Sequence, residues 1–157
     1  MNSDTNKLWQ DRIYLLLGGI FIASLISSNL IFQKFFFWTP FAFLANSDSG
    51  NWLSWLSEYT FELSVGILPY PITFLVTDII SEIYGREKAN RAVIVGFIAS
   101  IFIMGVVMVG DMVSATEWSP VDGSVFHKVF GLFGPAVFAS MTAYITAQFI
   151  DIRIFHF

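Results

Sequence analysis

Long apolar runs without charge alternate with short polar stretches along this chain. Ile13–Phe32 holds 20 uncharged residues and Ala92–Gly110 holds 19. Coiled as α-helices, such runs extend about 30 Å, which matches the hydrocarbon core of a bilayer. Leu132–Phe155 is a third run, interrupted near its end by polar and charged residues. We predict three membrane helices here, and the first is too long for a signal peptide.

A further apolar segment, Phe61–Tyr84, does not read as one continuous helix. Pro69 and Pro71 each remove a backbone donor and oppose the continuation of a helix that enters from Leu68. We expect the FELSVGIL stretch to be extended, re-entrant or a half-helix, and a true helix to run from about Pro71 to Tyr84. Such a break in a membrane is tolerated where protein or water covers it, although a proline kink without function remains open.

The polar stretches predict interfacial structure. Residues 38–60 carry tryptophan and tyrosine but no lysine or arginine, so they form either a surface helix over 52–59 or a loop with aromatic anchors. Gly85–Arg91 is expected to be a tight polar turn, and Asp111 is expected in the headgroup region. Residues 124–131, SVFHKVFG, place their apolar side chains on one side, as a surface helix would.

Composition strengthens the membrane interpretation. The chain is 55% hydrophobic and 13% charged, against about 45–50% and about 25% in soluble domains. We therefore predict an all-α, polytopic transmembrane helical bundle with four membrane segments, the second broken by proline, forming one domain over 1–157. The net charge of −4 suggests no nucleic-acid partner, and zero cysteines exclude a disulfide framework.

The positive charges predict an orientation. The N-terminal stretch holds two of them and Gly85–Arg91 holds three, whereas 38–60 has none and 112–131 has one. Because short cytoplasmic loops are enriched in lysine and arginine, the N-terminus and Gly85–Arg91 are placed inside. Asp78, Glu82 and Asp151 then lie toward the cytoplasmic half of the membrane.

These carboxylates are the main candidates for chemistry, because ionisable groups within a membrane usually serve a site or a pathway. Asp78 and Glu82 share about half of the circumference of their helix with Thr73 and Thr77, and we expect this face to meet a polar face of the last helix in a shared cavity. The alternative is that the carboxylates only form ion pairs near the inner interface, which is most plausible for Glu82. The polar face of the last helix consists of Ser140, Tyr144, Gln148 and Asp151.

Asn29 needs a partner or a cavity if its helix lies in lipid. An enzymatic site is not expected, because His127 and His156 are isolated on opposite predicted sides of the membrane and no phosphate-binding loop is present. No cofactor or metal is expected either.

Two stretches of the chain resemble the queuosine precursor transporter family, also called the vitamin uptake transporter family. They are PITFLVTDIISEIYG with its basic turn and ASMTAYITAQFIDIRIFHF. The shared pattern is a proline-led helix ending in D-x-x-x-E-x-Y-G and a later helix carrying Y-x-x-x-Q-x-x-D. The resemblance spans most of residues 61–157.

The resemblance implies a multi-pass importer in the bacterial inner membrane, with 7-cyano- or 7-aminomethyl-7-deazaguanine as its small heterocyclic substrate for tRNA modification. It also implies a six-helix bundle, so two C-terminal helices would be missing here. A carboxylate can accept two hydrogen bonds from the edge of a deazaguanine, and aromatic rings can stack on it. The expected substrate-binding residues are Asp78, Glu82, Gln148, Asp151, Asn29, Thr77, Tyr84 and Tyr144.

Two alternatives stay open at this point. The chain could be the substrate-capture subunit of an ATP-driven vitamin uptake system, which the capture of an ATPase partner would favour. It could also be a structural membrane protein without transport activity, in which the acidic residues only form ion pairs. The sequence leaves a homo-oligomer open in each case.

Overall fold

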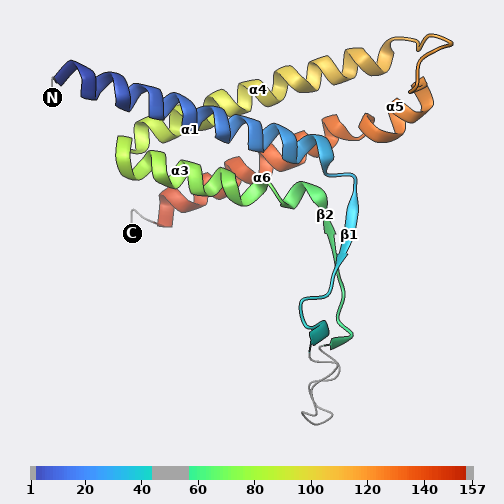
Figure 1. Cartoon of the computed structure of the whole chain (residues 1–157), viewed down its shortest axis with the longest axis horizontal. Coiled ribbons are helices and arrows are strands. Elements are labelled where there is room, and N and C mark those ends of the chain that lie inside the picture. Colours follow the sequence, from blue (N-terminus) through green and yellow to red (C-terminus); the bar gives the residue numbers. More distant parts are fainter. Residues whose placement is uncertain (1–2, 44–56, 155–157) are drawn as a thin grey trace.

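The protein is a helical bundle from which a two-stranded hairpin projects (Figure 1). The computed structural model describes residues 3–43 and 57–154, with side chains over 7–43 and 57–143 and at Thr146. The predicted surface helix over 52–59 therefore lies largely outside the described residues. The helices are α1 (Ser3–Ile31), α3 (Tyr70–Tyr84), α4 (Arg86–Met112), α5 (Gly123–Phe130) and α6 (Phe133–Ile154).

The predicted fold class is confirmed. Within the described part, four helical stretches are long and apolar enough to cross a membrane. They are Lys7–Ile31, Val65–Tyr84, Arg86–Met112 and Gly123–Ala143.

Successive long helices run in opposite directions. Tyr84 at the end of α3 donates a hydrogen bond to the carbonyl of Gln10 near the start of α1 (2.9 Å). Tyr14 donates in turn to the carbonyl of Lys88 at the start of α4 (3.1 Å). Figure 1 shows the start of α1 and the end of α6 at this same end of the bundle, with the hairpin at the opposite end. We call them the basic end and the hairpin end.

The proline-containing segment is broken, as its sequence predicts. Its first residues form β2 (Phe61–Ser64), which pairs antiparallel with β1 (Phe35–Trp38), and a short 3-10 helix, η2 (Val65–Ile67), follows. Pro71 then lies in the first turn of α3, where a missing amide hydrogen breaks no helical bond.

Hydrogen bonds to the end of α1 hold the broken segment in place. The hydroxyl of Ser28 donates to the carbonyl of Gly66, and that of Ser64 donates to the carbonyl of Phe32. The Gly66 amide in turn donates to the Ser64 hydroxyl (3.1 Å). Non-helical backbone near a membrane needs such partners, because lipid supplies none.

The prediction of a polar turn over Gly85–Arg91 is wrong, because α4 already begins at Arg86. Gly85 alone makes the corner, with a φ of +86° that a residue with a side chain rarely adopts. Glu87 in the first turn complements the helix dipole and pairs with Arg91 one turn later (2.5 Å). These features extend the helix through residues that the charge pattern alone assigns to a loop.

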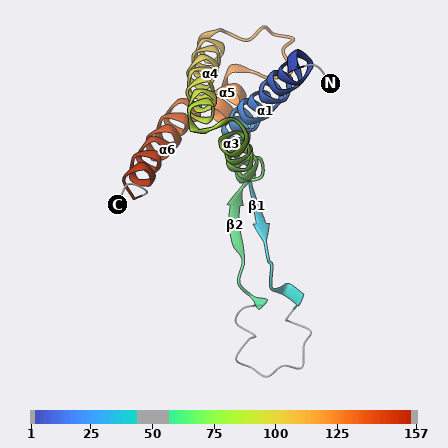
Figure 2. The ribbon, with the colours of Figure 1, turned by 90° about the vertical axis from the view of Figure 1, so that its left-hand side faces the viewer.

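Small residues on α4 let α1 approach it closely. Ala89, Ala92, Gly96 and Ser100 are buried at spacings of three and four residues, which places them along one face. A side chain added at Gly96 would put its Cβ 2.5 Å from Cε1 of Phe21 on α1. Figure 2 shows α1, α3 and α4 grouped together, with α6 diverging from them. Membrane helices commonly associate through such small residues.

A second cluster joins α6 to this group. Phe133, Val137 and Met141 are buried on one side of α6, and Phe97 and Met104 of α4 pack against them. A helix is present where the sequence predicts a surface helix; it is α5, whose Phe126 lies over Gly110 near the end of α4.

The contact between Phe21 and Gly96 generates the first prediction. Gly96→Ala should lower the melting temperature, since Phe21 is 3% exposed and has little room to move, and overpacking of this kind costs about 1–3 kcal/mol. Gly105→Ala is the matched control on the same helix, because no atom lies within 4 Å of its added Cβ. It should be neutral or stabilising, since alanine gains about 1 kcal/mol over glycine in a helix. Thermal unfolding in detergent compares the two, and equal stability of both variants would contradict the packing.

Candidate functional site

A cavity of about 160 Å³ opens among the four long helices. α1 contributes Phe21, Leu25 and Asn29, and α3 contributes Tyr70 and Thr73. The rest of the lining comes from α4 and α6. An apolar protein cavity of about 150 Å³ holds a benzene ring, so this one is large enough for a small ring compound. The residues from α4 and α6 are Val93, Ile94, Phe97, Ser140 and Met141.

Asn29 is the most polar group in this lining. Its side chain is buried, at 9% exposure, and its Nδ2 has no hydrogen-bond partner among the described residues. The hydroxyl of Thr73, by contrast, donates to the carbonyl of Tyr70 (2.6 Å). An amide nitrogen without a partner in an apolar setting costs about 1–3 kcal/mol. Of the two possibilities that the sequence leaves open for Asn29, a partner or a cavity, the structure places it at a cavity.

The structure separates Asp78 and Glu82 from this cavity. Thr73, Val76 and Ile80 form the buried face of α3, whereas Asp78 and Glu82 are exposed. Asp78 follows Thr73 by five residues, which turns it about 140° away around the helix. The polar face that the sequence predicts is therefore divided between the interior and the exposed surface.

The exposed face of α3 combines the two carboxylates with large apolar side chains. Phe74 is 50% exposed and Leu75 is 59% exposed, and both flank the carboxylates around the helix. Thr77 is half-buried, and its hydroxyl bonds to the carbonyls of Thr73 and Phe74. Two carboxylates facing lipid would be costly, so in a membrane this face needs cover from protein or water.

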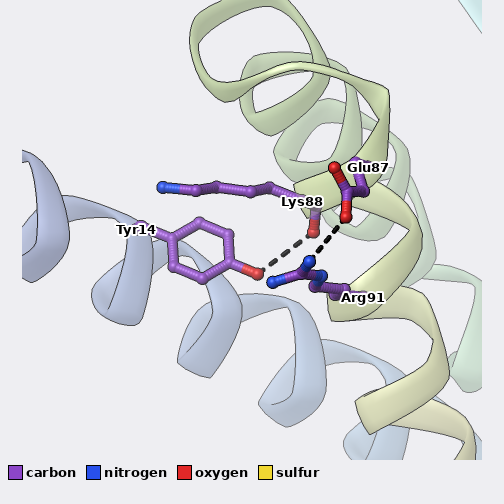
Figure 3. A network of polar contacts seen from close by, with 4 residues as sticks. All are labelled: Tyr14, Glu87, Lys88 and Arg91. Atoms are coloured by element: carbon purple, nitrogen blue, oxygen red, sulfur yellow. Dashed lines mark hydrogen bonds and ion pairs between the residues drawn. The ribbon is translucent and has the colours of Figure 1, made fainter.

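Tyr84 belongs to an aromatic cluster at the basic end. Its ring centroid lies 5.5 Å from that of Tyr14, and the ammonium of Lys88 lies 5.2 Å from the Tyr14 centroid and 5.1 Å from the Tyr84 centroid. Figure 3 shows the Tyr14 hydroxyl directed at the Lys88 carbonyl, with the Glu87–Arg91 pair beside it. The cluster thereby joins α1, α3 and α4 where these helices begin or end.

The remaining predicted site residues lie on α6. Tyr144, Gln148 and Asp151 fall within this helix, but their side chains are outside the described residues. Ser140 is the member of that predicted face whose position is described, and it lines the cavity together with Thr73. The lining residues Tyr70 and Phe97 are not evident from the sequence, because apolar periodicity does not distinguish the wall of a cavity from ordinary core.

The hairpin end carries a polar group of its own. Asp111 near the end of α4 contacts Nδ1 of His127 on α5 (2.7 Å). Hydrogen bonds from the Ser124 hydroxyl and the Val125 amide hold the pKa of Asp122 below its ordinary value of 3.8. A lowered pKa means that this cap stabilises α5 above pH 3.8, and that the stabilisation is lost as the pH falls through the folded-state pKa.

The family assignment comes from a segment that contains most of the helices described above. Residues 64–157 match a family described as "Putative vitamin uptake transporter", and this segment takes in all of α3, α4, α5 and α6. The chain belongs to this family. Membership in it, together with the apolar helices, indicates a multi-pass membrane protein.

Two curated relatives support the assignment. Proteins from Bacillus subtilis and Haemophilus influenzae, each named "Probable queuosine precursor transporter", are 26% identical to this chain over 92 and 100 residues. The alignments cover 59% and 64% of this chain, but only 40% and 41% of the relatives. The matched part thus spans about two fifths of their length. No solved structure matches the chain significantly.

The aromatic cluster generates the second prediction. Lys88→Met should lower the melting temperature, because two cation–π contacts are lost and each is worth about 0.5–1 kcal/mol at a partly exposed site. Arg86→Met is the matched control, since Arg86 is an exposed cation of α4 without a side-chain partner among the described residues. Thermal unfolding of both variants in detergent gives the comparison. The cluster would be energetically unimportant if the two variants melted alike.

Proposed function

We propose that this protein takes part in the import of queuosine precursors, 7-cyano- or 7-aminomethyl-7-deazaguanine, across a bacterial inner membrane. The observation that carries the proposal is the family match over residues 64–157, which contains most of the broken segment and the helix with Asp78 and Glu82. The names of the two relatives supply the substrate class. The substrate would cross unchanged, and no catalytic step is assigned to any residue.

The carboxylates of α3 suit such a substrate. The edge of a deazaguanine presents a ring N–H beside an exocyclic amine, and one carboxylate can accept a hydrogen bond from each. We assign this role to Asp78 and place Glu82 one turn away, where it could accept from a cationic aminomethyl group. Thr77, Gln148 and Asp151 complete the proposed set, and Tyr144 would stack on the ring.

The cost of exposing carboxylates to lipid supports this assignment. The exposed carboxylate face of α3 needs polar cover in a membrane, and a water-filled substrate path would supply it. Proline-broken segments commonly line such paths in transporters, because backbone groups freed from a helix can then bind solute or water. Tyr84 is placed differently, since its contacts commit it to the aromatic cluster at the basic end.

The orientation is proposed from the charges. The N-terminal parts of α1 and α4 meet at the basic end and carry most of the positive charges. These residues are Lys7, Arg12, Arg86, Lys88 and Arg91. Because cytoplasmic loops are enriched in such residues, we place the basic end in the cytoplasm and the hairpin outside.

The third prediction tests the transport function. Cells that cannot make queuosine precursors, and that lack their own importer, should regain queuosine in tRNA when given this chain and 7-cyano-7-deazaguanine. Asp78→Asn should reduce this salvage at least tenfold, because the neutral amide loses one of two charge-assisted bonds. Glu117→Gln, an exposed residue between α4 and α5, is the matched control. Normal salvage by Asp78→Asn at equal expression would remove Asp78 from the site.

The fourth prediction tests the orientation. Because the chain contains no cysteine, a single cysteine can be introduced without altering a native thiol. Cysteine at Asn90 should be protected from an impermeant maleimide in intact cells and labelled after lysis. Cysteine at Glu117 should be labelled in both conditions, and the reverse pattern would invert the proposed orientation.

A further inference from the structure

Asn29 and the cavity around it are not needed for the carboxylate site on α3, and they call for a separate explanation. The cavity lies toward the hairpin end of α1 and α3, since Asn29 is two residues from the end of α1 and Tyr70 begins α3. Asp78 and Glu82 do not line it. Its occupant must therefore be recognised by different chemistry.

The lining defines that chemistry. Phe21, Tyr70 and Phe97 offer aromatic surface, on which a planar ring can pack. Among the residues whose side chains the structure describes, no charged group belongs to the lining, so there a cationic ligand would lose its hydration without gaining a counter-charge. The occupant is accordingly flat, small and uncharged.

Asn29 supplies the polar contact. A carboxamide has an N–H donor beside a carbonyl acceptor, and it pairs bidentately with a ring edge that presents the opposite order, as asparagine does with adenine. The Nδ2 of Asn29 has no partner within the described protein and belongs to a side chain more than nine-tenths buried. A buried donor of this kind is rare unless it serves a ligand or a bound water.

We propose that this cavity is a binding site for an uncharged, planar nitrogen heterocycle, held by the carboxamide of Asn29 between aromatic side chains. The inference rests on the proposed function for the identity of the heterocycle. It adds that the cavity distinguishes between the two deazaguanines. The neutral nitrile-bearing base enters it, whereas the cationic aminomethyl base is left to the carboxylates of α3.

Direct binding to the complete chain, purified in detergent, tests the proposal. In an Asp78→Asn/Glu82→Gln background, which removes the carboxylate site, titration calorimetry should show 7-cyano-7-deazaguanine binding at least roughly 100-fold more tightly than the aminomethyl base, because the cavity offers the ammonium no counter-charge. Asn29→Leu should weaken the cyano base at least about tenfold, since its hydrogen bonds to the amide are lost. Asn90→Leu makes the same change at an exposed position of α4 and should leave binding unchanged.

Stability gives an independent readout. Asn29→Leu should melt at the same temperature as the parent chain or higher, because Nδ2 loses no protein partner when it is replaced. Ser140→Phe is a second variant, which should block the cavity from α6 without touching Asn29. Weak binding by both variants, with folding retained, is the expected result.

Two outcomes would overturn the inference. If Asn29→Leu and Ser140→Phe bind the cyano base as tightly as the parent chain, the amide holds only a water and the cavity is not the site. If both bases bind equally and only Asp78→Asn weakens them, recognition lies on the carboxylate face.

Salvage in cells separates this inference from the proposed function. Salvage by the parent chain and by both cavity variants would retain the function and reject the cavity. Binding that depends on Asn29 without any salvage would retain the cavity and reject transport. Absence of both binding and salvage would reject the two together.

Discussion

The close packing of Phe21 on Gly96 is the contact on which the arrangement of the bundle depends. It brings α1 against α4 at a separation that admits no side chain on α4 at this position. Val76 and Ile80 of α3 belong to the same buried cluster as Phe21, so α3 is positioned by the same contact. Phe21 also forms part of the cavity wall. Phe21 thus contributes both to the packing of the helices and to the wall of the proposed binding site.

The two ends of the bundle are held together by different interactions. At the basic end, aromatic rings and a lysine join the helices, and the tyrosine hydroxyls bond to backbone carbonyls. At the hairpin end, serine hydroxyls bond to the backbone of the broken segment. The first arrangement tolerates water and charge. The second supplies hydrogen-bond partners where a membrane would not.

The proposed polar sites occupy different faces of α3. Thr73 lines the cavity together with Asn29, whereas Asp78 and Glu82 lie on the exposed face. A neutral site against one face of α3 and an acidic site on another face would let a substrate exchange partners on its way across the membrane. The neutral base and the cationic base would then differ in the site at which each is held most tightly.

The sequence by itself determined the membrane class, the break at the prolines, the helical segments and the family, because apolar run length, missing amide hydrogens and the D-x-x-x-E-x-Y-G motif are local features. It could not place the start of α4 at Arg86, since the single residue Gly85 completes a turn that the charges appear to extend. Only the tertiary structure decided which side of α3 is buried. Helical periodicity places Thr73 within the same half of the helix as Asp78, but packing against α1 and α4 selects Thr73, Val76 and Ile80 for the interior and leaves Asp78 outside.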